Sequence, residues 1–211
     1  MSHARAVLDG VLAVALRSLG TEAFLDVLPR GATCFPGVAR LAFKDGADHA
    51  RLTLADLGDC VLVPAASAGD AMAAELWALA PLYCARGAGD FEAAASARDA
   101  VLAALNGADA ARKRVACECL AALGARRDQP SAGACARKCL PALFGAALDD
   151  DADAAAAAAA AVAAVAPNAE PSFVSAIFKK LATRLLGSCL LYTSDAADEG
   201  LGVDLGGRRI I

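Results

Sequence analysis

Pairs of cysteines at short spacing are the residues of this sequence most suited to chemistry. Cys117 and Cys119 are separated by one residue, and Cys135 and Cys139 by three. Thiolates at short spacing can bind zinc, but zinc sites commonly use pairs separated by two residues, often with a histidine. No histidine lies near these cysteines, which neighbour alanine and leucine. The pattern therefore favours buried thiols in a reducing compartment over a metal site.

The remaining reactive residue types form no catalytic constellation. His3 and His49 are the only histidines, and neither lies beside a patterned serine, cysteine or aspartate that it could activate. The glycines do not have the spacing of a phosphate-binding loop. The acidic run Asp149–Asp153 could bind a cation, but it is more typical of a solvated helix start, where the helix dipole favours negative charge. The sequence thus indicates no enzyme and no cofactor.

Basic residues form small clusters that could contact a partner. They are Arg112, Lys113 and Arg114; Arg126 and Arg127; Arg137 and Lys138; and Lys179 and Lys180. If successive helical hairpins stack, equivalent positions align on one face, and the clusters would form a basic ridge for RNA or another partner. The alternative is that each cluster is a solvated helix face. The net charge of −4 argues against wholesale electrostatic binding of nucleic acid, though not against a local patch.

Composition predicts that helices position these residues. The chain is 58% hydrophobic, but alanine alone supplies more than a quarter of its 211 residues. Alanine has the best helix propensity and adds little core volume, and β-branched and aromatic residues are sparse. We therefore expect an all-α fold. No apolar run is long enough for a membrane span, and the N-terminus lacks the pattern of a secretory signal, so no membrane partner is expected.

The stretch Glu75–Cys84 is the centre of the predicted fold. Leu76, Leu79 and Tyr83 form one stripe of a helix, with the only tryptophan, Trp77, beside it. Pro81 should kink or break this helix near residue 80. The segment is therefore expected to be a buried helix rather than a catalytic loop.

Further helices are indicated by cap and stop residues along the chain. The expected N-caps are Thr21, Asp70, Asp90, Asp109 and Ser131, and the expected stops include Gly20, Pro64, Gly124 and Pro167. Helices are predicted over residues 3–17, 38–43 and 51–63, with a strand at 60–63 as the rival, and a last one begins at Pro171 or Ser172. Residues 30–65 are the least regular part. Helices of some fifteen residues with short turns favour a HEAT-like α-solenoid of antiparallel helical hairpins over residues 1–188.

Four segments resemble, in order, the HEAT-repeat family of ribosomal RNA-processing protein twelve. Residues 75–84, followed by Gly89-Asp90-Phe91, match its Q-x-W-x-L-L-P-x-F-C helix and the turn after it. Residues 112–120 match L-R-x-x-V-C-x-A-L, residues 136–145 match A-K-N-F-L-P-x-L-F-N, and residues 19–29 match G-P-E-x-x-L-x-x-L-P. The agreement extends over about residues 10–186, except that residues 30–65 depart from the family pattern.

This resemblance implies a nuclear and nucleolar scaffold that helps process pre-ribosomal RNA and export ribosomal subunits. Its expected partners are pre-ribosomal particles, ribosomal RNA and proteins of the export machinery. A second possibility is a transport-receptor-like adaptor that binds a GTPase or protein cargo without RNA. A third is a helical enzyme fragment that lacks its catalytic part.

Residues 189–211 differ from the rest of the sequence. Cys189–Glu199 resembles the in-frame translation of a sequencing adaptor, and Val203–Ile211 resembles the flow-cell end of the same oligonucleotide. We expect this segment to be an artefactual or disordered tail and no natural domain. Without it, 18 basic and 20 acidic residues remain, so the rest of the chain is close to neutral.

Deletion of residues 189–211 should leave the melting temperature unchanged within a few degrees, because the tail was not selected together with the fold. Thermal unfolding followed by circular dichroism compares the two chains. A large loss of stability would show that the tail is natural sequence that packs on the helices.

Overall fold

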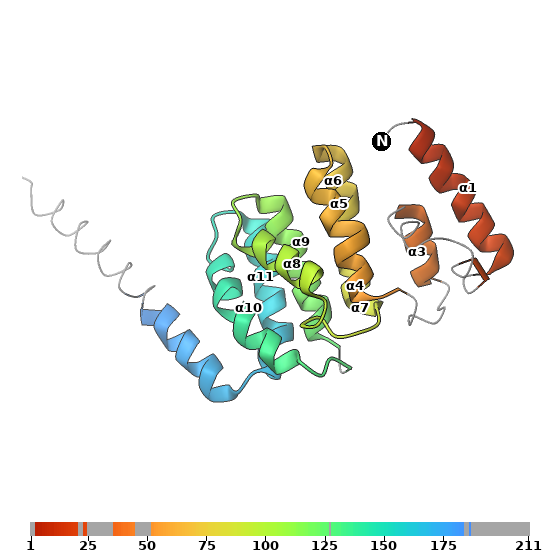
Figure 1. The fold of residues 1–211 in the computed structure, drawn as a ribbon. Coiled ribbons are helices and arrows are strands. Elements are labelled where there is room, and N and C mark those ends of the chain that lie inside the picture. The colour runs from red at the N-terminus through yellow and green to blue at the C-terminus, as the bar shows by residue number, and fades with distance from the viewer. Residues whose placement is uncertain are drawn as a thin grey trace, which may run out of the picture. The chain divides into compact units, whose positions relative to one another are not determined.

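The computed structural model describes residues 3–20, 23–24, 36–44, 52–126, 128–183 and 186. The chain divides into two compact units, Met1–Glu170 and Pro171–Ile211. Every regular element of the described residues is helical, apart from a single isolated bridge between Thr53 and Ala88. The predicted all-α class is therefore confirmed (Figure 1).

Helices α1 and α3 pack against each other. Helix α1 (His3–Leu19) ends at Gly20, whose φ of 78° is the left-handed conformation that glycine adopts without strain. Helix α3 (Pro36–Lys44) is joined to α1 by a hydrogen bond from the Val38 amide to the Asp9 carboxylate, 3.3 Å long. The helices predicted over residues 3–17 and 38–43 are confirmed. Most of the helix expected after Thr21 lies outside the described residues.

One continuous helical segment follows, in which the helix changes its hydrogen-bond spacing. It consists of α4 (Leu54–Asp56), the π-helical turn η3 (Leu57–Leu62) and α5 (Val63–Ser67). Thr53 and Asp56 form a reciprocal capping box at its start. The predicted stop at Pro64 is wrong, because the helix continues to Ser67. The π turn lies directly before Pro64. Proline has no amide hydrogen to donate, and the π turn shifts the spacing of the helical hydrogen bonds so that the helix can continue past it.

Pro81 separates the next two helices, α6 (Asp70–Trp77) and α7 (Ala80–Arg86). The predicted break near residue 80 is confirmed, and Leu76, Trp77 and Tyr83 are buried as expected. Asp70 is not the N-cap of α6: Gly69 occupies that position, and Asp70 lies inside the first turn.

Helices α8 (Ala95–Asn106) and α9 (Ala110–Gly124) test two predicted caps. The Asp109 carboxylate accepts a hydrogen bond from the Arg112 amide at 3.1 Å and caps α9 as predicted. Asp90 does not cap α8, which begins five residues later. Its carboxylate instead accepts a hydrogen bond from the Ser131 hydroxyl.

Helices α10 (Ala132–Ala146) and α11 (Ala152–Val165) follow, and a 3-10 turn, η4 (Ala166–Asn168), closes the first unit. Ser131 is at the N-cap position of α10 but makes no capping bond with its side chain. The start of α11 agrees with the prediction for the acidic run, because Asp151 accepts a bond from the Ala154 amide at 2.9 Å.

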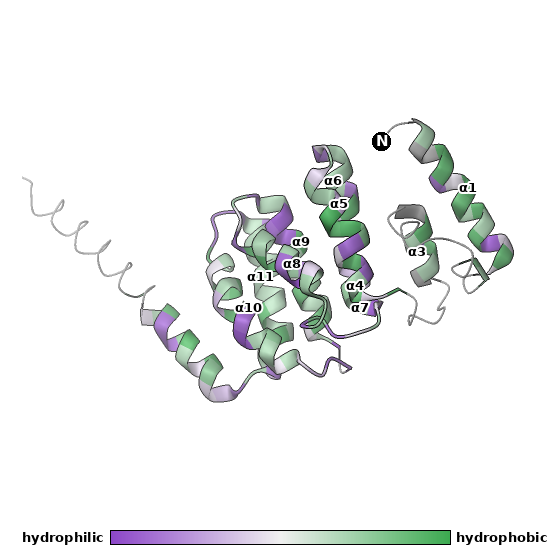
Figure 2. Cartoon of the chain, viewed as in Figure 1, coloured by the Kyte–Doolittle hydropathy of each residue, from purple (hydrophilic) through white to green (hydrophobic). Residues whose placement is uncertain are grey.

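The core of the first unit is organised around α9. This helix packs most extensively on α11 and also contacts α7, α8 and α10. The face that α11 turns inward contains Ala154, Ala158, Ala161 and Val165, all almost fully buried. Figure 2 colours the chain by hydropathy, in which the visible parts of α10 and α11 are mostly pale green. Small side chains let the two helix axes approach closely, so backbone-to-backbone packing replaces bulky side chains in this core.

The described part of the second unit is a helix over residues 171–183, which confirms the start predicted at Pro171 or Ser172. Phe178 is 62% exposed on it. The predicted tail, residues 189–211, lies outside the described residues. No helix in the described part of the chain has the length and apolarity that crossing a membrane requires.

Replacing Gly124 with alanine tests the close approach of α9 and α11. A Cβ at this position would lie 2.8 Å from the backbone of Ala164 and from Val165, so the helices would have to separate. We expect a loss of about 1–3 kcal/mol of unfolding free energy. Gly145→Ala is the matched control: nothing lies within 4 Å of its Cβ, and it should stabilise α10 by up to about 1 kcal/mol. Urea denaturation measures both, and equal effects would contradict the close packing.

Candidate partner-binding surface

Three predicted basic residues lie together at the start of α9, and each forms an internal ion pair. Arg112 lies 3.2 Å from Asp109, and Arg114 lies 3.8 Å from Glu118. Lys113 donates a hydrogen bond to Asp149 across the turn between α10 and α11, and this bond holds the pKa of the Asp149 carboxyl below its usual range. The three cations are thus adjacent along the first turns of α9 and are partly neutralised by neighbouring carboxylates.

Arg126 is a structural residue at the opposite end of α9. From Lys113 to Arg126 the helix rises about 20 Å, so these residues do not form one cluster. The Arg126 guanidinium donates to the carbonyl oxygens of Gly87 and Cys84, at 2.7 and 3.1 Å, and pairs with Asp128. Its side chain is only 9% exposed. The hydrogen bond to Asp128 raises the pKa of Arg126 above its usual value.

The other predicted cations have different environments. Arg137 is exposed on α10, without an ion pair in the described part of the chain, and Lys138 pairs with Glu92. Lys179 and Lys180 are exposed on the helix of the second unit. Arg127 lies outside the described residues. A continuous basic ridge therefore stays a prediction.

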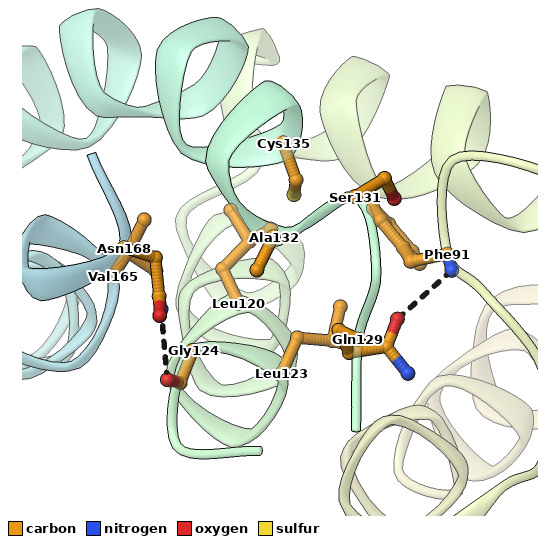
Figure 3. A pocket seen from close by; sticks show the side chains of 10 residues that line it. All are labelled: Phe91, Leu120, Leu123, Gly124, Gln129, Ser131, Ala132, Cys135, Val165 and Asn168. Atoms are coloured by element: carbon orange, nitrogen blue, oxygen red, sulfur yellow. Dashed lines mark hydrogen bonds between the residues drawn. The ribbon is translucent and has the colours of Figure 1, made fainter. Parts of the chain in front are cut away.

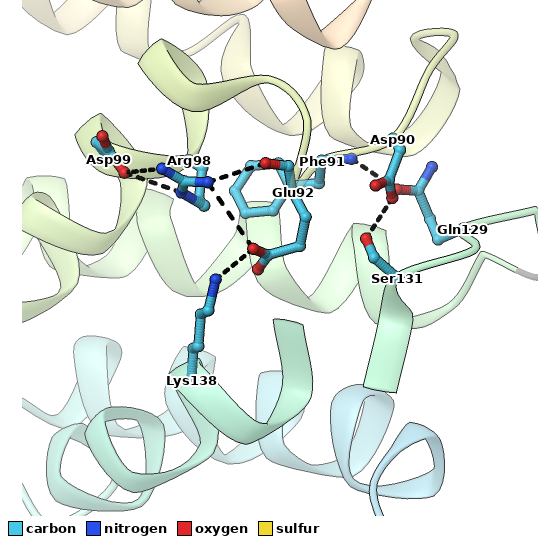
Figure 4. Close-up of polar contacts among 8 residues, drawn as sticks. All are labelled: Asp90, Phe91, Glu92, Arg98, Asp99, Gln129, Ser131 and Lys138. Carbon is cyan, nitrogen blue, oxygen red and sulfur yellow. Dashed lines mark hydrogen bonds and ion pairs between the residues drawn. The ribbon is translucent and has the colours of Figure 1, made fainter. Parts of the chain in front are cut away.

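A polar network holds the loop between α7 and α8 against the residues before α10 (Figure 4). The Phe91 amide donates to the Gln129 side chain at 3.0 Å, and Gln129 in turn donates to the Gly89 carbonyl at 2.9 Å. Beside them, the Ser131 hydroxyl donates to Asp90. Sequence reasoning missed the role of Gln129. The only available signal was a polar residue beside a turn proline in an alanine-rich region.

Glu92 continues this network toward α8 and α10. Its carboxylate pairs with Lys138 and lies 3.8 Å from Arg98, whose guanidinium also donates to the Glu92 carbonyl at 2.9 Å. Arg98 pairs further with Asp99 at 2.8 Å (Figure 4). These ion pairs connect the loop after α7 with α8 and α10. The ammonium group of Lys138 is therefore already paired with a carboxylate of the same chain.

A hollow beside this network is too small for a substrate. Figure 3 shows the side chains that line it, which include Phe91, Leu120, Gln129, Cys135 and Asn168. Its volume is about 20 Å³, which is room for about one water molecule. The Asn168 amide donates to the Gly124 carbonyl at 3.0 Å and so closes one side of the hollow. The arrangement stabilises the helix junction and offers no space for a reaction.

The predicted thiols are mostly buried. Cys117, Cys119 and Cys139 have no exposed surface, whereas Cys135 is half-buried, and all four are free. Burial raises the pKa of Cys117 to about 11 and that of Cys119 well above its usual range. In the described part of the chain, no three side chains of His, Cys, Asp or Glu gather as metal ligands. The thiols of α9 are therefore held protonated and act as small apolar groups.

Open hollows flank Trp77 on the surface formed by α5, α6 and the turn between α8 and α9. Two of them, of about 300 and 270 Å³, share Trp77, Asp109 and Arg112. A third, of about 360 Å³, adjoins the second through Ala111 and Arg114. We call these three hollows the Trp77 groove. The groove includes Arg112 and Arg114, two residues of the predicted basic surface.

Comparison of the chain with protein-family models, with curated proteins and with solved structures finds no match. Its function must therefore be argued from the surface and from the sequence resemblance.

Replacement of Arg126 with alanine should lower the free energy of unfolding by about 2 kcal/mol. The change leaves the Cys84 and Gly87 carbonyls without their charged donor and removes a nearly buried side chain. Arg137→Ala is the control and should change stability by less than about 0.5 kcal/mol, because Arg137 is exposed. Chemical denaturation measures the free energy of unfolding of both variants. If Arg126→Ala is as stable as the unchanged chain, this arginine has no structural role.

Proposed function

We propose that residues 1–188 are part of a HEAT-like α-solenoid and that the chain is a non-enzymatic scaffold in ribosome biogenesis. In this role it helps pre-ribosomal RNA processing and the export of ribosomal subunits from the nucleus and nucleolus. The observation that carries the proposal is that the family-like segments supply the contacts between successive helices. Tyr83 on α7, Leu120 on α9 and Leu140 on α10 are all fully buried.

The order of helix contacts supports the solenoid. Helix α9 contacts its hairpin partner α8, the preceding α7 and the following α11, while α10 contacts α11. Contacts within a helix pair and with the equivalent helix of the next pair are typical of stacked helical repeats, in which each pair buries its apolar face against the next. The two thiols of α9 are buried and held protonated, which suits a structural role for this helix.

The internal ion pairs favour a second candidate, the transport-receptor-like adaptor that binds a GTPase or protein cargo without RNA. Lys113, Arg126 and Lys138 each have a carboxylate partner in the fold. A phosphate would have to displace these partners, so the number of cations available to RNA is smaller than the sequence suggests.

Arg112→Gln with Arg114→Gln tests RNA binding by the surface at the start of α9. If both arginines contact phosphates, the slope of log affinity against log salt should decrease by about two units for structured ribosomal RNA. The control replaces Arg17 and Arg40, which are exposed on α1 and α3, and should leave the slope unchanged. Binding is measured by fluorescence anisotropy across salt concentrations.

Unchanged affinity and slope in the first variant would exclude this surface as an RNA site. Crosslinking in cells then separates the two functions: pre-ribosomal RNA in the crosslinked material supports the scaffold, and protein partners alone support the adaptor.

A further inference from the structure

The walls of the Trp77 groove are built from alanine. The alanines that line it are Ala66, Ala74, Ala78, Ala100, Ala103, Ala104, Ala108, Ala110 and Ala111. Leu62 and Trp77 form the apolar floor, and both are buried beneath the surface. A wall of methyl groups lets the backbone of a second helix approach closely, while the edge of an aromatic ring gives the larger side chains of that helix a contact.

The net side-chain charge of the groove is negative, because four aspartates line it, Asp70, Asp109, Asp151 and Asp153, beside the two arginines Arg112 and Arg114. Its two cations are already paired, Arg112 with Asp109 and Arg114 with Glu118. Asp70 and Asp153 also line the groove, are exposed, and have no ion pair in the described part of the chain. Such a surface repels the phosphates of a nucleic acid and attracts a cationic partner.

We propose that the Trp77 groove docks a basic amphipathic helix of a protein partner. Its leucine-like side chains lie against Trp77 and the alanine walls, and its lysines or arginines pair with Asp70 and Asp153. This inference rests on the geometry and charge of the groove, and it stands whether or not the chain acts in ribosome biogenesis.

A synthetic helical peptide tests the proposal directly. The probe has about 16 residues, with leucines at helical spacing on one face, lysines on the flanks and no tryptophan. Because Trp77 is the only tryptophan of the chain, its fluorescence reports occupation of the groove. We expect saturable binding to the full chain that weakens as salt is added. A peptide with glutamate at every lysine position should not bind, and equal binding of the two peptides would overturn the proposal.

Charge variants test whether the basic peptide binds in the groove itself. Asp70→Asn with Asp153→Asn should weaken binding by about two- to tenfold, the range expected for two exposed ion pairs. The control, Asp59→Asn with Glu170→Gln, removes the same charge from exposed positions outside the groove and should bind like the unchanged chain. An equal loss in both variants would show nonspecific attraction and overturn the assignment.

Filling the groove gives an independent test. Ala74 is exposed on α6 and lines the second hollow, so Ala74→Phe should abolish the change in Trp77 fluorescence without unfolding the helix. Circular dichroism checks that each variant is folded. If Ala74→Phe does not fold, the charge variants alone test the proposal. Competition by polyuridylic acid for the same fluorescence change would identify a nucleic-acid surface instead, and would overturn the proposal.

Discussion

The close approach of α9 and α11 is the constraint on which the first unit depends. Alanine supplies more than a quarter of the chain, so few side chains are large enough to span a gap between helices. The helices must instead bring their backbones together, and at Gly124 there is no space for even one additional methyl group. Dispersion contacts fall off steeply with distance, so this core gains cohesion only where the spacing is tight. The buried leucines of α9 then complete the packing on either side.

Tight packing of helices leaves the polar groups of the connecting loops to be satisfied by side chains. The loop after α7 has backbone carbonyls and amides without helical partners, and groups of this kind are costly when buried. Arg126 and Gln129, from the segment after α9, bond to Gly87, Gly89 and Phe91 in that loop. The same segment therefore fixes the loop between α7 and α8. Arg126, which the sequence assigns to the surface, is thus part of the structural framework.

Local signals in the sequence predicted local structure well, and they failed where a distant residue competed. Asp109 caps α9 because its partner is three residues away and the turn brings the two together. Asp90 has the same chemistry, but Ser131, 41 residues further along the chain, takes its carboxylate. The two prolines differ for a local reason instead. Pro81 separates two helices as expected, whereas Pro64 lies within a helix because the preceding π turn accommodates it.

The candidate surface was only partly predictable, for the same physical reason. A sequence gives the number of cations but not their partners, and Lys113 and Lys138 find carboxylates 36 and 46 residues away. The Trp77 groove left a different signal that could have been used. A tryptophan whose surroundings consist mainly of alanine leaves recesses beside its ring, because methyl groups fill little of the space around an indole. Hollows beside Trp77 therefore follow from composition, although which helices form them depends on the tertiary fold.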